Sequence, residues 1–106
     1  MYLRKTIVTF SDAVEIPGQV LPAGTYVFRL ADSSTDRHIV QIWNADETQI
    51  QATTITIPNT RFERHDRTIF ELEERAGDSP MALKVWFYPG DSTGQEFVYS
   101  HHSYNR

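Results

Sequence analysis

The stretch Val20-Leu-Pro-Ala-Gly-Thr-Tyr-Val-Phe-Arg-Leu30 decides the fold class. Its first half holds the turn formers Pro22 and Gly24, and an alternating segment follows them at once. One face of that segment carries Tyr26, Phe28 and Leu30, and the other carries Thr25, Val27 and Arg29. This alternation predicts a half-buried β-strand that starts from a tight turn.

Similar segments recur along the whole chain. We expect further strands at residues 5–10, 14–16, 37–44, 49–57, 61–64, 68–73, 82–88 and 96–100, with 61–64 and 68–73 as the arms of a hairpin. Both faces of 37–44 are largely apolar, which predicts a central strand covered on both sides. Only residues 71–76 offer a helical alternative, and it is short.

The number and spacing of these segments predict an all-β fold. About eight strands joined by Gly, Pro, Asn and Asp turns are typical of an antiparallel β-sandwich, jelly-roll-like in its connections, or of a small β-barrel. The lack of helical crossovers argues against a parallel sheet. We expect a single β-domain over residues 1–106.

Composition excludes several classes of function. The net charge is −4, and the basic residues between Arg61 and Arg67 are interrupted by Glu63 and Asp66, so nucleic acid is not an expected partner. The chain has no cysteine, which excludes disulfides, thiolate metal sites and cysteine nucleophiles. No apolar run is long enough to span a membrane, and residues 1–5 lack the apolar core of a secretion leader.

Several segments also resemble, in their order and spacing, a family of small bacterial proteins of no established function. The segments are Thr6–Phe10, Val14–Gly18, Leu21–Phe28, Asp36–Ile42, Asn44–Glu47, Trp86–Asp91 and Gln95–Tyr99. Members of that family often carry a secretion leader, so the resemblance implies an extracellular or periplasmic β-domain. It implies no catalytic residues. This chain departs from the family in having no leader and in ending at Arg106, where similar proteins often continue.

Four histidines are the candidate metal ligands, because imidazole suits copper and zinc. His101 and His102 follow the last expected strand, His65 lies at the expected hairpin tip, and His38 lies within a strand. Neighbouring residues of an extended segment point to opposite sides, and no HxH or HExxH spacing is present. The pattern favours solvated or packed histidines, with a copper or zinc site of His65, His101 and His102 as the alternative.

Carboxylates give weaker candidates. Glu71 and Glu73 share one face of an expected strand, and Glu96 lies beside a turn-rich loop. Paired carboxylates serve glycosidase chemistry, but a solvated outer row explains these residues better. The segments 32–36 and 91–94 offer oxygen ligands for calcium without the spacing of an EF-hand, so ordinary turns are the favoured interpretation.

Aromatic residues are the candidates for binding. Trp86 and Tyr88 share a strand face, and Trp43 lies on another apolar strand. If exposed, these side chains would form a platform for sugars or proteins; burial in the core is the favoured interpretation.

Two functions follow from the sequence, and a small-molecule pocket inside a β-barrel is a third possibility. The first is a non-catalytic secreted domain that binds a protein or carbohydrate, or associates with copies of itself. The alternative is a small copper or zinc enzyme acting on an extracellular polysaccharide.

Overall fold

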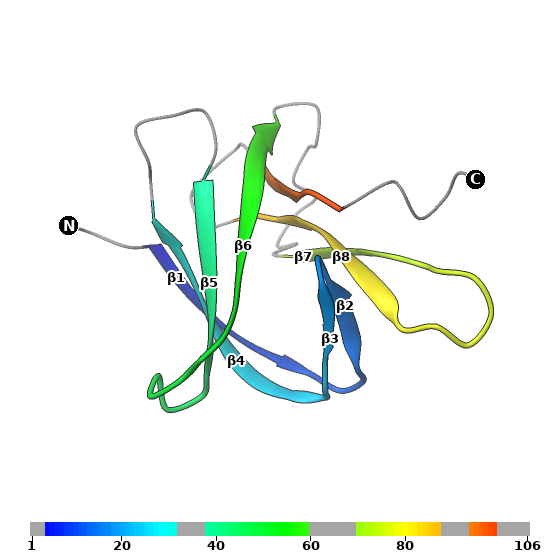
Figure 1. Cartoon of the computed structure of the whole chain (residues 1–106), viewed down its shortest axis with the longest axis horizontal. Helices are drawn as coiled ribbons and strands as arrows, with labels where there is room; N and C mark the ends of the chain where they lie inside the picture. The colour runs from blue at the N-terminus through cyan, green and yellow to red at the C-terminus, as the bar shows by residue number, and fades with distance from the viewer. Residues whose placement is uncertain (1–3, 32–37, 60–69, 88–93, 100–106) are drawn as a thin grey trace.

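The computed structural model describes residues 4–31, 38–59, 70–87 and 94–99 and is all-β within these ranges, as the sequence predicts (Figure 1). The strands described are β1 (Arg4–Phe10), β2 (Val14–Ile16), β3 (Gln19–Leu21), β4 (Gly24–Ala31), β5 (His38–Asn44), β6 (Ile50–Asn59), β7 (Phe70–Glu73), β8 (Met81–Trp86) and β9 (Gly94–Phe97). The expected strand at 61–64 lies outside the described residues. The described ranges contain no helix that could cross a membrane.

All of these strands belong to one sheet. Its order is β1-β4-β5-β6-β9-β8-β2-β3, with β7 on the second edge of β8. Every neighbouring pair is antiparallel except β2 and β8, which run parallel with Val14 opposite Met81. The sheet is therefore mixed, with one parallel pair among the antiparallel pairs that the sequence predicts. Strands β3 to β7 lie between these two parallel strands in the chain.

The sheet curls around one hydrophobic core and does not close. Phe28 of β4 is at its centre, with ring-centroid distances of 5.1 Å to Phe70, 5.9 Å to Trp86 and 6.5 Å to Phe97. These contacts join β4 to β7, β8 and β9, so the two halves of the sheet face each other across the core. The path of pairings ends at β1 and at β3 without joining them.

The alternation of the opening tract is confirmed in β4. Tyr26, Phe28 and Leu30 are buried in the core, and Val27 on the opposite face is fully buried as well. Arg29 covers part of that outer face, because its guanidinium lies 4.5 Å from the ring centre of Trp43. The tract thus forms a strand that packs on both sides.

Strand β5 is not covered on both sides, contrary to the expectation from its apolar faces. Val40 and Ile42 point into the core and are fully buried, but Ile39 on the outer face keeps 39% of its surface exposed. Ile39 lies directly opposite Ile55 of β6, which is also exposed. The outer face of β5 and β6 is therefore an apolar surface.

Strands β3 and β9 also differ from the sequence prediction. The short strand β3 was not expected, and it pairs with β2 across a turn in which Gly18 has a φ of +89°, a conformation that favours glycine. Strand β9 begins at Gly94, two residues before its predicted start at Glu96, and it ends at Phe97. In the sheet, β9 lies between β6 and β8 and pairs with both.

Candidate functional site

The structure divides the candidate aromatic residues between the core and the surface. Trp86 is fully buried, and its indole Nε1 donates a 3.2 Å hydrogen bond to Thr6 Oγ1, so it cannot stack on a ligand at the surface. Trp43 is half-buried beneath Arg29, and its Nε1 donates to Gln41 Oε1 at 3.3 Å. Tyr88 lies outside the described residues. Trp43 and Trp86 therefore do not form a common platform.

The side chains of the candidate metal ligands lie outside the part of the chain that the structure describes. His65, His101 and His102 lie outside the described residues, and of His38 only the backbone, in β5, is described. Within 4–31, 38–59, 70–87 and 94–99, no group of three His, Asp or Glu side chains could hold a metal ion. The calcium candidates 32–36 and 91–93 also fall outside these ranges.

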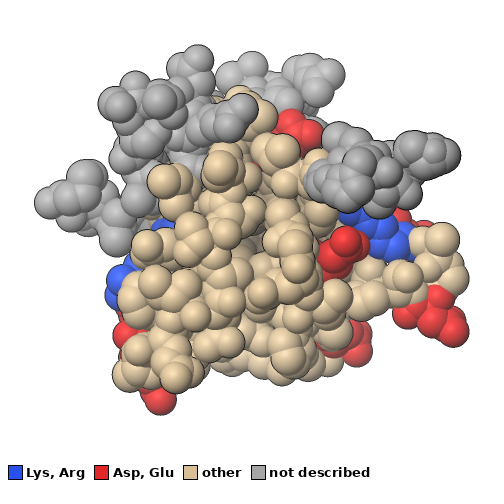
Figure 2. All heavy atoms as spheres, in the orientation of Figure 1, with Lys and Arg blue, Asp and Glu red and all other residues tan. Residues whose placement is uncertain are grey.

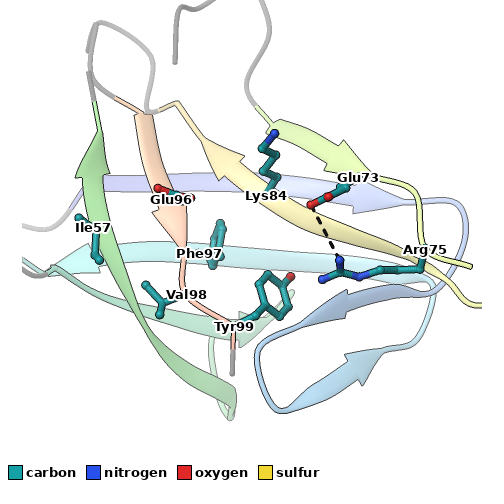
Figure 3. Close-up of a pocket in the computed structure, with 8 residues that line it drawn as sticks. All are labelled: Ile57, Glu73, Arg75, Lys84, Glu96, Phe97, Val98 and Tyr99. Atoms are coloured by element: carbon teal, nitrogen blue, oxygen red, sulfur yellow. Dashed lines mark ion pairs between the residues drawn. The ribbon is translucent and has the colours of Figure 1, made fainter. Parts of the chain in front are cut away.

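The carboxylates Glu73 and Glu96 line one pocket on the outside of β8 and β9 (Figure 3). Its volume is about 370 Å³. The lining residues are Ile57, Glu73, Arg75, Lys84, Glu96, Phe97, Val98 and Tyr99. Charges of both signs thus meet apolar side chains here. Figure 3 shows Arg75 reaching toward Glu73 from the segment that follows β7, and the separation of their charged groups is 3.9 Å.

Arg75 and Tyr99 form a brace at the floor of this pocket. The Nε of Arg75 donates to Glu15 Oε1 at 3.0 Å, and its guanidinium lies 5.0 Å from the ring centre of Tyr99. The Tyr99 hydroxyl lies 2.6 Å from the carbonyl oxygen of Leu83 and 3.1 Å from that of Glu15. The brace therefore ties the end of β9 to β2 and β8.

The electrostatics of the brace suit a structural role. Burial raises the pKa of the Tyr99 hydroxyl far above its usual range, and the hydrogen bond that Arg75 donates to Glu15 raises the pKa of Arg75. Tyr99 therefore stays protonated and Arg75 stays charged at physiological pH. The described residues lining the pocket include the carboxylates Glu73 and Glu96 and the amine of Lys84, but no serine, histidine or cysteine.

A more unusual feature lies on β6, whose two faces are reversed in polarity. Thr54 and Thr56 point inward and are 7% and 0% exposed, whereas Ile55 and Ile57 point outward and are 43% and 40% exposed. The buried hydroxyl of Thr56 donates to Gln95 Oε1 at 3.1 Å. A strand that only had to fold would bury its isoleucines and expose its threonines. The reversal places large apolar side chains in solvent.

These isoleucines belong to a larger surface of uncharged residues, which we call the β5–β6 face; Arg29, over Trp43, and Glu96, beside Ile57, lie at its borders. Its outward-pointing residues on the two strands are Ile39, Gln41, Trp43, Thr53, Ile55 and Ile57, and the exposed Val98 adjoins them after β9. Figure 2 shows that charged side chains gather at the margins of this side of the molecule, while its middle is free of them. Exposed apolar surface without charge is typical of an interaction site.

Comparisons with known proteins identified no relative of this chain. No protein-family model, no curated protein and no solved structure matches the chain.

The sequence contained the residues of the β5–β6 face but not their orientation. The run Thr53-Thr-Ile-Thr-Ile57 consists entirely of β-branched residues, which favour a strand on either face. Its regular Thr/Ile alternation is the signal from which an outward isoleucine row could have been considered. Only the pairing of Ile55 with Ile39 and of Thr56 with Phe97 shows which set points inward.

Proposed function

We propose that this chain is a non-catalytic binding or assembly module, and that the β5–β6 face is the surface by which it engages another protein. The observation that carries the proposal is the reversed polarity of β6, with threonines inside and isoleucines outside. Fully burying one isoleucine side chain contributes about 1.5–3 kcal/mol. A partner that covers Ile39, Ile55 and Ile57 would gain part of this stabilisation for each residue.

A protein fits this surface better than a carbohydrate does. Sugar rings are commonly held by exposed aromatic side chains, and the large exposed apolar residues in the described part of the chain are all aliphatic. β-Branched side chains on a flat strand pair are well suited to packing against another sheet or strand. The partner is therefore a protein, either a second copy of this chain or a different one.

The resemblance to small exported bacterial proteins supports an extracellular or periplasmic location for this activity. A secreted module that binds through a preformed face needs neither a cofactor nor a catalytic group. This location is part of the proposal.

Site-specific photo-crosslinking in the producing cell tests the proposal. A photoreactive amino acid at Ile55 should give a discrete adduct, either a homodimer or a single larger species. The same probe at Leu72 of β7 is the matched control, because Leu72 is 40% exposed against 43% for Ile55 but lies away from the face. Equal labelling at the two positions, or no discrete adduct at Ile55, would refute the proposal.

A charge substitution supplies the second arm of the experiment. Ile39→Lys places a cation in the uncharged surface and should abolish the adduct formed at Ile55, whereas Leu72→Lys should leave it unchanged. Sedimentation of the purified protein over a concentration series then distinguishes self-association from binding of a different protein.

A further inference from the structure

The two edges of β6 are paired over different lengths. β6 pairs with β5 over most of its residues, but β9 pairs with its second edge only at Thr56–Asn59. No described strand pairs with the second edge of Gln51–Ile55. In an antiparallel strand about every second residue turns its N–H and C=O toward the same side. This part of β6 therefore presents backbone groups that pair with no described strand, although the Gln51 carbonyl accepts a hydrogen bond from the Gln19 side chain.

Strand β3 lies across from this open edge. Gln19 Nε2 donates a 3.1 Å hydrogen bond to the carbonyl oxygen of Gln51, so a side chain rather than a backbone ladder joins the two strands in the described structure. β3 itself pairs with β2 on its other edge. We call the gap between Gln19–Leu21 and Gln51–Ile55 the β3–β6 seam.

Two local features lie near the seam. The register of β5 and β6 shifts so that Ile42 faces Ala52 and Trp43 faces Ile50, which leaves Gln51 as a bulge residue. After β9, Tyr99 anchors the chain to the carbonyls of Glu15 and Leu83. At Tyr99 the chain is thus held against β2 and β8.

A pocket of about 340 Å³ adjoins the β6 side of the seam, and none of the described residues that line it is charged. It is lined by Pro17, Thr53, Thr54, Ile55, Ile57 and Val98. Ile55, Ile57 and Val98 are also exposed members of the β5–β6 face, so the pocket and the face are continuous. Any segment that lies in this pocket meets both apolar side chains and the open backbone edge of β6.

We infer that the seam accepts an extended, uncharged, β-branched peptide segment of a partner protein, which adds to β6 as a strand. Backbone groups of the segment would pair with Gln51–Ile55, and its alternate side chains would pack on Ile55, Ile57 and Val98. A charged side chain would lose its hydration against this lining without a compensating ion pair. This inference rests on the proposed function and identifies the form of the partner.

Amide hydrogen exchange of the free protein gives the first test. About every second amide of residues 51–55 should exchange quickly, while the amides that bond to β5 should be protected. Uniform protection of these amides in the dilute protein would show that the seam is closed and would overturn the inference. Protection that appears only as the protein concentration rises would assign the seam to a second copy instead of a partner protein, and would overturn the stated occupant.

Peptide selection gives the second test. A random library of short peptides is selected on the purified protein, and the selected peptides are synthesised. We expect uncharged, β-branched sequences that protect the fast amides of residues 51–55, and N-methylation of alternate amides should weaken their binding by about tenfold or more. Failure to select any peptide, or selected peptides whose protection maps to another surface, would overturn the inference.

A closed seam provides the matched control. Because the chain contains no cysteine, Gln19→Cys combined with Gln51→Cys introduces two unique attachment points. A bifunctional maleimide that bridges them should abolish peptide binding, whereas a monofunctional maleimide on the same variant should preserve more of it. If the bridged protein still forms the Ile55 photo-adduct with its partner, strand addition is wrong while the proposed function stands.

Discussion

The hydroxyl of Tyr26 donates a 2.6 Å hydrogen bond to the carbonyl oxygen of Pro22, four residues before it in the chain. The Tyr26 ring is buried and lies 6.2 Å from the ring of Phe10. The bond fastens the turn that precedes β4 to the first buried side chain of that strand. Tyrosines fix the corners of many β-sandwich domains in a similar way.

Tyr26→Phe should therefore destabilise the protein by about 1–2 kcal/mol, because it removes a hydrogen bond and leaves the Pro22 carbonyl without this donor. Urea unfolding followed by tryptophan fluorescence measures the change. Thr25→Val is the control. It removes the exposed hydrogen bond between the hydroxyls of Thr9 and Thr25, and it should alter stability by less than about 0.5 kcal/mol. Equal stability of Tyr26→Phe and the wild type would contradict the structural role of this bond.

Gly94 should not tolerate a side chain, for reasons of space alone. A Cβ at this position would lie 2.5 Å from Val85 Cγ1 and 2.9 Å from Phe87 Cε1, and both neighbours are fully buried. Gly94→Ala should destabilise the fold by about 1–3 kcal/mol through overpacking, as measured by urea unfolding.

A double-mutant cycle with Val85→Ala isolates this cause. Because Val85→Ala removes the nearest atom, Gly94→Ala should cost at least about 0.5 kcal/mol less in that background. Gly18→Ala is the control: space around Gly18 is open, but its φ of +89° makes alanine unfavourable by about 1–2 kcal/mol. Its cost should be the same with and without Val85→Ala. Strict additivity for Gly94 would contradict the overpacking explanation.

An ion-pair cluster should make stability depend on pH. The carboxylate of Glu47 accepts hydrogen bonds from Arg29 and, at 3.2 Å, from Lys5, and the bond from Arg29 is the main cause that lowers its pKa below the usual 4.5. The stabilisation from a depressed carboxyl pKa is complete above the unfolded-state pKa and is lost as pH falls through the folded-state pKa.

The melting temperature of Glu47→Gln should accordingly be lower than that of the wild type near pH 7, and the difference should disappear in acid below the folded-state pKa of Glu47. Added salt should reduce the difference at neutral pH, because the cluster is partly exposed. Calorimetric scans across pH and salt measure both effects. A difference that persists unchanged into strong acid would show that the charge of Glu47 is not its cause.

Sequence patterns predicted the strands that have one apolar and one polar face. β1 and β4 show the predicted alternation, with Phe10 of β1 and Tyr26, Phe28 and Leu30 of β4 in the core, although Thr6 is also buried on the inward face of β1 and Val27 is buried on the outer face of β4. β3 was missed because three residues between two Pro/Gly turns carry no readable period. The parallel pairing of β2 with β8 depends on contacts between segments far apart in the chain, which local patterns do not encode.

The candidate site was harder to predict for a related reason. Apolar residues on both faces of β5 indicated a covered strand, but composition does not show whether a second layer exists to cover it. The aromatic pattern at Trp86 was consistent with a platform or with core, and burial of Trp86 decides between them. In β6, threonine and isoleucine both favour strands, so the pattern did not show which of the two residue types points into the core.

The reversed polarity of β6 should be visible in the stability of its threonine variants. Thr54 and Thr56 are both buried, but Thr56 Oγ1 donates to Gln95 Oε1, and no side-chain hydrogen bond of Thr54 to another described residue is seen. Thr54→Val should therefore raise the free energy of unfolding by up to about 1 kcal/mol, while Thr56→Val should lower it by about 1–2 kcal/mol. Urea unfolding of the two isosteric variants makes the comparison. If Thr54→Val is as harmful as Thr56→Val, the inward threonines serve the fold itself. The outward isoleucines would then follow from a structural need for threonine inside, and the reversal would no longer support a binding surface.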